Sequence, residues 1–244
     1  MFKLIVNIYF LILLFKITKA QIHLTKDNLD QVCGCKSSQK VVISIGYLNI
    51  STVDPDTFNG LNTLEQLYLL SNQIKTIHPS TFNGLSSIKE LWLSKNQLTT
   101  IHPSTFDGLN SLRLIDLDGN QLTTIDSFTF NGLNSLTFLY LDYNQITKID
   151  PTSFNGLNSL QRLDSNNNRI TKIEEGTFKD LVKLRELNLQ SNNIVSFNKN
   201  ALIGLTNLEK VCLFDNPISS LFPTSMASIC NGNSKCKLFI NSKC

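Results

Sequence analysis

The sequence has no hydrophobic run after residue 15 that is long enough to cross a membrane, and its first run is itself short. The segment "LIVNIYFLILLF" at 4–15 has 12 residues, whereas a transmembrane helix needs about 20 apolar residues. It follows Lys3 and precedes "KITKA", whose small residues come just before Gln21. This pattern predicts a cleaved secretory signal peptide over residues 1–20, with an uncleaved membrane anchor as the alternative. We therefore expect a secreted, extracellular chain without a membrane span.

A net charge is also missing from the part of the chain that follows this segment. Residues 1–20 contain three lysines and no acidic residue, so 22 − 3 = 19 basic residues remain against 19 acidic residues. Electrostatic attraction to nucleic acid or to an anionic membrane surface needs an excess of lysine and arginine. We therefore expect no nucleic-acid partner and no binding to anionic lipid.

Cysteine is absent from the middle of the chain. The six cysteines are Cys33, Cys35, Cys212, Cys230, Cys236 and Cys244. The three histidines are far from them in the sequence, and the C-x-C spacing of the first two is not a usual zinc pair, which disfavours a zinc site. An even number of cysteines in an exported chain indicates disulfides, and we expect two of them among the last four cysteines. Four cysteines allow three pairings, and the sequence does not choose among them.

What the sequence does contain is an internal repeat. The nonapeptide "IHPSTFNGL" at 77–85 recurs as "IHPSTFDGL" at 101–109. Phenylalanine recurs every 24 residues, as Phe58, Phe82, Phe106, Phe130, Phe154 and Phe178, and Leu202 continues the row. Asparagine recurs as Asn72, Asn96, Asn120, Asn144, Asn168, Asn192 and Asn216. Between them runs L-x-x-L-x-L-x-x-N-x-[LI], as in "LEQLYLLSNQI" at 64–74.

This pattern resembles the leucine-rich repeat family in its 24-residue extracellular form, over about 170 residues. The resemblance implies a repeat solenoid of the α/β horseshoe class, with a curved parallel β-sheet on the concave face and irregular or short helical turns on the convex side. It also implies a non-enzymatic protein without a cofactor that binds its partners through the concave face. We accordingly expect a signal peptide, an N-terminal cap (21–40), the repeats (41–207), and the last coil with a cysteine-bearing C-terminal cap (208–244).

The coil can also be derived from the residues alone. Each L-x-L is a short strand whose alternate side chains point to opposite faces, so Leu67 and Leu69 point inward and Tyr68 points outward. So short a strand cannot bury its apolar side alone, and successive coils must stack around a shared core that the phenylalanines close. The recurring asparagine can bond backbone groups that each turn leaves unpaired, and the glycine of "NGL" suits a positive φ.

The two ends depart from the family's pattern. The family's N-terminal caps usually carry four cysteines, whereas residues 21–40 carry two, which leaves their pairing open. In its C-terminal caps the first cysteine usually follows the strand, whereas Cys212 lies within it. We still expect both caps to cover apolar coil ends that water would otherwise reach.

One inward position breaks the leucine row. Ser165 stands where Leu141 and Leu189 stand in the neighbouring coils. Its hydroxyl is expected to find a partner or a water, or to face a gap between the coils.

His78 and His102 occupy the same position in successive repeats. A catalytic role would require a nucleophile and an orienting acid beside them, and the repeats supply neither. We therefore interpret both histidines, together with the threonines of "PSTF", as parts of the structural template.

The candidate binding residues are outward positions of the predicted strands and one residue beside them. They are Tyr68, Trp92, Asp116, Asp118, Phe138, Tyr140, Asp142, Tyr143 and Asp164. Side chains on neighbouring strands should lie about 4.8 Å apart. The aromatic residues are candidate anchors, and the aspartates form an acidic patch that suits a basic partner. The alternative is a solvated sheet whose side chains only pack against their cross-strand neighbours.

The aspartates also raise two chemical alternatives. Asp118 and Asp142 should be neighbours, with Asp116 nearby, which makes a calcium site conceivable. Exposed carboxylates are more often only solvated, and we predict no metal. A glycosidase needs two carboxylates in different environments, one with a raised pKa, and an open sheet offers no pocket for this.

The sequence thus predicts a secreted binding module for an extracellular protein or glycan, in adhesion, matrix or immune recognition. A structural matrix or coat protein without a specific ligand is the alternative. The sequon Asn49-Ile50-Ser51 makes Asn49 a candidate glycosylation site on the first coil. The oligomeric state does not follow from the sequence.

Overall fold

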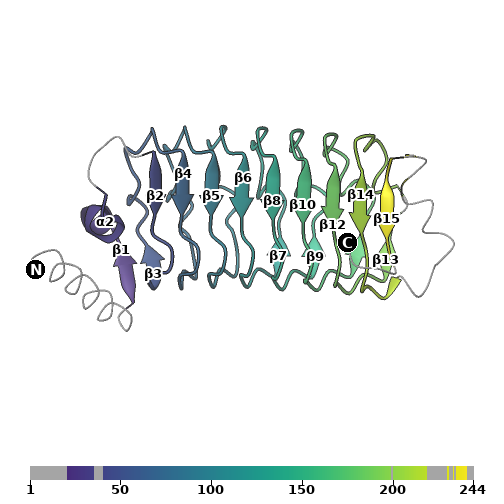
Figure 1. The fold of residues 1–244 in the computed structure, drawn as a ribbon, viewed down its shortest axis with the longest axis horizontal. Coiled ribbons are helices and arrows are strands. Elements are labelled where there is room, and N and C mark those ends of the chain that lie inside the picture. Colours follow the sequence, from purple (N-terminus) through teal and green to yellow (C-terminus); the bar gives the residue numbers. More distant parts are fainter. Residues whose placement is uncertain are drawn as a thin grey trace, which may run out of the picture.

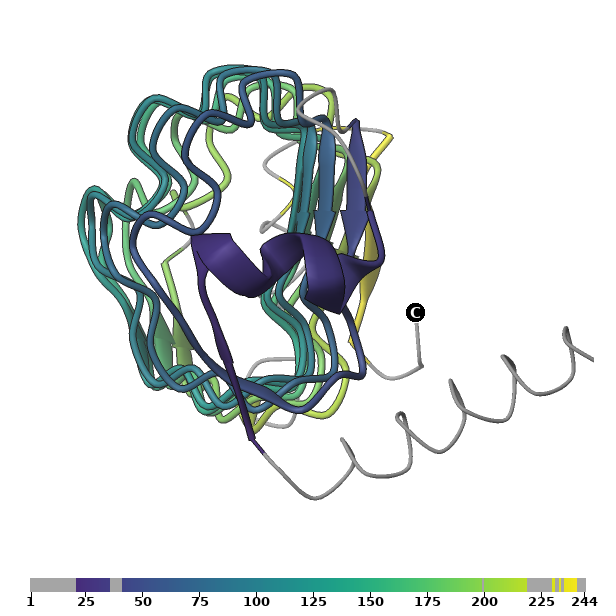
Figure 2. The ribbon, with the colours of Figure 1, turned by 90° about the vertical axis from the view of Figure 1, so that its left-hand side faces the viewer.

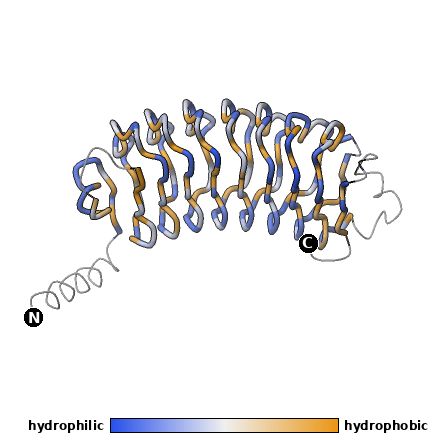
Figure 3. Tube along the Cα trace, turned by 45° about the horizontal axis from the view of Figure 1, so that its top comes forward, coloured by the Kyte–Doolittle hydropathy of each residue, from blue (hydrophilic) through white to orange (hydrophobic). Residues whose placement is uncertain are grey.

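The chain folds into a stack of coils that carries one long parallel sheet (Figure 1). The computed structural model describes residues 21–35, 41–198, 200–218, 230, 233 and 235–240. In spatial order the sheet contains β2 (Val42–Ser44), β4 (Gln66–Tyr68), β5 (Glu90–Trp92), β6 (Leu114–Asp116), β8 (Phe138–Tyr140), β10 (Arg162–Asp164), β12 (Glu186–Asn188), β14 (Lys210–Cys212) and β15 (Lys237–Phe239). Strands of successive repeats pair without a slip, so that Tyr68 is the direct neighbour of Trp92. The stack bends into a shallow arc (Figure 3).

The opposite, convex side consists mostly of turns. Its short strands form two pairs, namely β7 (Thr124–Ile125) with β9 (Lys148–Ile149) and β11 (Lys172–Ile173) with β13 (Ser196–Phe197). The predicted fold class, a repeat solenoid with a curved parallel sheet backed by irregular turns, is confirmed.

A row of phenylalanines forms the back of the core. Its members are Phe58, Phe82, Phe106, Phe130, Phe154 and Phe178. All are at most 1% exposed, and each ring stacks on the next with centroids 6.0–6.5 Å apart. The inward leucines of the strands, such as Leu67 and Leu69, are fully buried. Apolar and polar residues consequently alternate along every coil (Figure 3), and each coil buries its apolar side against its neighbours.

The recurring asparagines tie successive coils together. The Oδ1 of Asn120 accepts a hydrogen bond from the Leu98 N–H, and its Nδ2 donates to the carbonyls of Leu93 and Leu117, each at 3.0 Å. The same three bonds recur at Asn72, Asn96, Asn144, Asn168, Asn192 and Asn216. The predicted role of this residue, bonding unpaired backbone groups inside the turn, is confirmed.

Two positions in the coil adopt a left-handed backbone. The glycine of "NGL" is one of them, as predicted, with φ of 81° at Gly84. The second lies in the turn that follows the concave strand, three residues after its end, and the sequence pattern did not reveal it. It is occupied by Ser71, Lys95, Gly119, Tyr143, Asn167, Ser191 and Asp215, with φ of 51–63°. Glycine is dispensable there because a hydrogen bond to the next coil holds the turn, as from the Tyr143 N–H to the Asn166 carbonyl at 3.1 Å.

The N-terminal segment covers the first coil. It contains β1 (Ile22–Leu24), which pairs in parallel with β3 (Ile50–Val53), and α2 (Lys26–Cys33). The helix begins with a capping box and lies across the end of the stack, where it buries Leu29 (Figure 2). Cys33 and Cys35 form a disulfide directly after it.

The C-terminal segment extends the sheet by one strand, β15, which pairs in parallel with β14. Cys230 and Cys236 form a disulfide just before β15. Cys212 is also disulfide-bonded. Cys244 and the predicted signal peptide lie outside the described residues. Within the described part of the chain, no helix has the length and apolar character needed to span a membrane.

Ser165 points inward, as predicted. It is fully buried, and its hydroxyl has no hydrogen-bond partner among the described residues. The coil therefore contains an unpaired buried hydroxyl at a position that leucine fills in its neighbours.

Replacing Ser165 by leucine is expected to raise the free energy of unfolding by about 1 kcal/mol, because the change adds apolar volume and removes an unpaired hydroxyl. Ser165→Ala is expected to gain less, because it removes the hydroxyl without filling the position. Urea unfolding followed by circular dichroism measures both variants. A loss of stability in both would show that a buried water satisfies the hydroxyl.

Candidate functional site

The predicted binding residues lie together on the concave sheet. One column contains, in register, Tyr68, Trp92, Asp116, Tyr140 and Asp164. Asp118 and Asp142 lie two residues further along their own coils than the members of this column, and Phe138 lies two residues before Tyr140 on the same strand. Tyr143 lies in the turn after β8. The structure therefore places all of the candidates on five successive coils, from the coil of Tyr68 to that of Asp164.

At the N-terminal end of this face, two aromatic residues share one carboxylate. The rings of Tyr68 and Trp92 stack with their centroids 5.7 Å apart and their planes inclined by 19°. Glu90 accepts hydrogen bonds from the Trp92 Nε1 at 3.1 Å and from the Tyr68 hydroxyl at 3.4 Å. The rings are thus ordered while both side chains remain partly exposed, so a ligand can contact them at a small cost in side-chain entropy.

Two aspartates of the central column are less exposed than the sequence suggested. Asp116 is 7% exposed and Asp164 is 6% exposed. Asp116 lies between the large side chains of Trp92 and Tyr140 on the adjacent strands. The interpretation of these carboxylates as freely solvated is therefore wrong, because it considered each strand without the bulk of its neighbours.

Four aspartates form one electrostatic group, which we call the acid centre: Asp116, Asp118, Asp142 and Asp164. One carboxylate oxygen of each of Asp118, Asp142 and Asp164 is buried without a hydrogen-bond partner among the described residues. Burial raises the pKa of Asp142 to about 7, and the charges of the other three aspartates add to the rise. Burial also raises the pKa of Asp118, and it raises that of Asp164 against the opposing effect of Arg162. A carboxyl pKa is therefore raised on this open sheet.

A residue outside the predicted set, Arg162, borders the acid centre. Its Nε donates to the Asp164 Oδ2 at 2.9 Å, and its Nη1 lies 3.0 Å from a carboxylate oxygen of Glu186. Its guanidinium also lies 6.0 Å from the centroid of the Tyr140 ring. Sequence reasoning selected only the aromatic Phe138 from the column that precedes the central one, and so missed Glu90 and Arg162 in that same column. The alternation of the strands places both residues outward and was the signal that could have found them.

Two further aromatic residues extend the exposed surface. Phe138 is 36% exposed on β8, and Tyr143 is 61% exposed in the following turn. Tyr143 has a φ of 51°, a backbone conformation that bulky residues seldom adopt. Both rings are accessible to a ligand.

The histidines lie apart from this face. The Nδ1 of His78 accepts from the Ser80 N–H at 3.2 Å, and that of His102 accepts from the Ser104 N–H at 3.1 Å. Both side chains are exposed and shape the same turn in successive coils. These contacts agree with the interpretation of the histidines as structural template.

Asn49, the candidate glycosylation site, is half-buried where the cap meets the first coil. Its carbonyl accepts from the Ile22 N–H at 3.0 Å, and its side chain accepts from Gln73. Glycosylation there stays a prediction.

Comparison with known families identifies the repeats. The model of the family described as "Leucine rich repeat" matches residues 63–122, 115–164 and 165–218. The chain belongs to the leucine-rich repeat family. Members of this family are typically non-enzymatic binding scaffolds. A comparison with curated protein sequences finds no match.

Three solved structures illustrate the similarity of this leucine-rich-repeat protein to others. A structure of TLR13 in a complex with the RNA ssRNA13 has a TM-score of 0.74 and 25% identity, covering 91% of this chain and 31% of that one. A leucine-rich-repeat protein of Leptospira interrogans has a TM-score of 0.70 and 25% identity, covering 81% and 48%. Internalin C2 of Listeria monocytogenes has a TM-score of 0.64 and 26% identity, covering 89% and 92%. The chain spans less than half the length of the first two.

The acid centre of this leucine-rich-repeat protein does not form a ready metal site. Among the described residues, the only three metal-ligating side chains that could reach one ion are Asp30, Cys33 and Cys35. The two cysteines are joined in a disulfide, so they offer no thiolate. The calcium alternative therefore gains no support from the positions of the aspartates.

Replacing Asp142 by asparagine is expected to stabilise the protein above pH 7, by about 1 kcal/mol, because it removes the charge of a half-buried carboxylate that has one unpaired oxygen. The pKa of Asp142 is raised from 3.8 to about 7 by folding. The folded state therefore binds a proton more tightly than the unfolded state, and the native protein loses stability as the pH rises from about 4 to about 7. The advantage of the variant should be greatest above pH 7 and should disappear near pH 4.

Urea unfolding at several pH values measures this effect. Asp107→Asn, at an exposed aspartate of a convex turn, serves as the matched control and should show no such dependence. An Asp142→Asn advantage that is equal at pH 4 and pH 8 would contradict the assigned pKa.

Proposed function

We propose that this leucine-rich-repeat protein is a secreted module that recognises an extracellular protein or glycan through its concave face. The observation that carries the proposal is the acid centre, where three buried carboxylate oxygens lack a partner among the described residues. Like charges gathered at buried positions destabilise the free protein, and Arg162 compensates only part of this group, through Asp164. A cationic group bound there would relieve this cost, which is a physical reason for a ligand.

The surroundings of the acid centre favour a partner that combines a basic group with apolar surface. Trp92 and Tyr140 flank Asp116 in the central column, and Phe138 and Tyr143 are exposed nearby. Aromatic anchors beside a charged centre are typical of strong contacts in protein interfaces. An RNA backbone is disfavoured at this position because phosphate groups would meet carboxylates; TLR13 is the neighbour that has been solved with RNA.

Secretion is part of the same proposal. Residues 1–20 have the composition of a signal peptide, and the mature chain would begin near Gln21. Mass spectrometry of the exported protein tests this, and retention of the segment from Met1 to Ala20 would contradict it.

Replacing Trp92 or Tyr140 by alanine is expected to weaken binding by more than about 1 kcal/mol each, because both rings lie in the centre of the proposed surface. The ligand for this measurement is one captured from extracellular fluid by the mature protein and then purified. Titration calorimetry gives the affinity of each variant.

His78→Ala and His102→Ala are the matched controls, since these exposed side chains lie on the connecting turns. They should leave the affinity unchanged. Loss of binding in the histidine variants, with none in the aromatic variants, would refute the concave-face assignment. Failure to capture any ligand, together with self-assembly of the chain, would favour the alternative of a structural matrix or coat protein.

A further inference from the structure

The C-terminal end of the concave face contains an open hollow of about 720 Å³. It lies over β12, β14 and β15 and is bordered by the turns beside them. Its lining residues are Glu186, Glu209, Lys210, Lys235, Lys237 and Phe239. Three lysines against two glutamates give this lining, which we call the C-terminal hollow, a net positive charge.

The two glutamates of the hollow have cationic partners outside it. Glu186 pairs with Arg162 at 3.0 Å, and Glu209 lies 3.8 Å from Arg185. The ammonium groups of Lys235 and Lys237 are exposed, and no described residue forms an ion pair with them. The charge that the hollow offers to a ligand is therefore positive.

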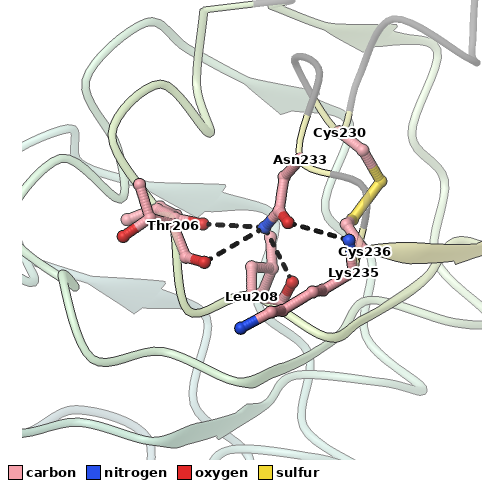
Figure 4. Close-up of a disulfide and its surroundings, with 7 residues drawn as sticks. Thr206, Leu208, Cys230, Asn233, Lys235 and Cys236 are labelled. Carbon is pink, nitrogen blue, oxygen red and sulfur yellow. Dashed lines mark hydrogen bonds between the residues drawn. A yellow bond between two sulfur atoms is a disulfide. The ribbon is translucent and has the colours of Figure 1, made fainter.

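Lys235 is positioned by the cap rather than by a free loop. The Nδ2 of Asn233 donates to the Leu208 carbonyl at 2.9 Å, and its Oδ1 accepts from the Lys235 N–H at 3.0 Å. The next residue, Cys236, forms the disulfide with Cys230, and Figure 4 shows this bond beside Asn233 and Lys235. The asparagine attaches this segment to the last coil, and the disulfide closes the short loop that contains Lys235.

Lys237 is held by the sheet itself. It pairs in register with Lys210 on the adjacent strand, and its N–H donates to the Glu209 carbonyl at 2.9 Å. Phe239 ends the same strand, and the Nζ of Lys210 lies 5.7 Å from the centroid of its ring. The hollow thus combines an aromatic ring with ammonium groups on a rigid backbone.

We propose that the C-terminal hollow binds an anionic glycan, a sugar chain that carries sulfate or carboxylate groups. The backbones of adjacent strands are about 4.8 Å apart. Lysines on β14 and β15 therefore project side by side, so successive anionic groups of one sugar chain can each meet an ammonium group. An aromatic ring supplies the apolar contact that the C–H face of a sugar needs. The hollow is open and lacks the enclosed apolar pocket that an anchor residue of a protein partner fills, which favours a glycan over an acidic protein.

This inference rests on the proposed function in one respect: it takes the concave face as a surface that binds an extracellular protein or glycan. The hollow has the opposite charge from the acid centre, and Arg162 links their borders because it contacts both Asp164 and Glu186. The residues of the hollow changed in the test below are not members of the acid centre, so the two proposals are tested by different variants and can fail independently.

The test uses the mature chain with its disulfides intact and a heparin-derived tetrasaccharide as the probe, measured by titration calorimetry. A desulfated tetrasaccharide distinguishes sulfate from carboxylate recognition, and a hexaglutamate peptide represents an acidic protein segment. The double variant Lys235→Gln/Lys237→Gln should bind the tetrasaccharide about tenfold more weakly, because it loses two charge-assisted contacts. Phe239→Leu should weaken the tetrasaccharide several-fold and leave hexaglutamate unaffected, because only the sugar uses the ring.

The control variant Lys148→Gln/Lys172→Gln removes the same charge from exposed lysines of the convex side. It should change the affinity by less than about twofold, since distant exposed charges are screened by salt. Asp142→Asn should also retain tetrasaccharide binding, which separates this test from that of the acid centre. The proposal is overturned if the tetrasaccharide does not bind, if the control weakens it as much as the hollow variant, or if hexaglutamate binds equally well.

Discussion

Replacing Asn144 by alanine is expected to lower the free energy of unfolding by at least about 3 kcal/mol, because three buried backbone groups lose their partner at once. The Oδ1 of Asn144 accepts from the Leu122 N–H at 3.0 Å. Its Nδ2 donates to the carbonyls of Leu117 and Leu141 at 3.0 and 3.1 Å. Water cannot replace the side chain without opening the coil, since Asn144 is only 7% exposed.

The effect should be specific to the interior asparagines. Asn131→Ala, at the exposed asparagine of "NGL" in the same region, is expected to cost little, since its side chain is in water. Asn144→Asp should also be strongly destabilising, because a carboxylate keeps the acceptor and loses both donors. Urea unfolding followed by circular dichroism gives all three values. A loss of less than about 1 kcal/mol for Asn144→Ala would mean that the backbone finds other partners and that the row is not a structural requirement.

Replacing Phe130 by alanine is expected to cost about 3–5 kcal/mol, the range for removing a buried aromatic side chain that its surroundings cannot replace. Phe130 is fully buried, and its ring stacks on those of Phe106 and Phe154 at 6.0 and 6.2 Å between centroids. Because each coil contacts only its neighbours, the cavity would interrupt the core at the centre of the stack. Thermal and urea unfolding measure the loss.

The chain supplies its own matched control two residues away. Phe128 is 60% exposed and has a φ of 67°, so Phe128→Ala should have little effect, and Phe128→Gly should be stabilising because glycine tolerates this backbone. Phe130→Leu should cost less than Phe130→Ala, since it keeps most of the apolar volume. Equal losses for alanine at the two phenylalanines would refute the role of the stacked row.

These predictions separate the scaffold from the surface that carries function. Asparagine and phenylalanine recur from coil to coil, with Leu48 and Leu202 as exceptions in the end coils, because each interface between coils presents similar unpaired backbone groups and a similar space to fill. The outward strand positions have no such requirement. Differences between coils therefore accumulate there, and a partner can be recognised by residues such as Trp92 and Asp142 without a cost to the stack.

The sequence by itself determined the coil. The constant repeat period, with alternation inside each strand, placed Leu67 inward and Tyr68 outward and predicted that Ser165 would be buried. These conclusions hold because the pattern depends on backbone geometry that every repeat shares. The register of the sheet followed from the same period, since equal coils stack with equivalent residues side by side.

Only the tertiary structure decided the chemistry of the concave face. The burial of Asp116 depends on the bulk of Trp92 and Tyr140 on adjacent strands. The raised pKa of Asp142 depends first on burial and then on charges that include those of other coils. The pairing of β15 with β14, which creates the C-terminal hollow, comes from a segment outside the repeat. A periodic sequence specifies the position of each residue in its coil and the face of the sheet to which its side chain points. Its exposure and charge state depend on the lengths and charges of side chains in the adjacent coils, which a repeat pattern does not contain.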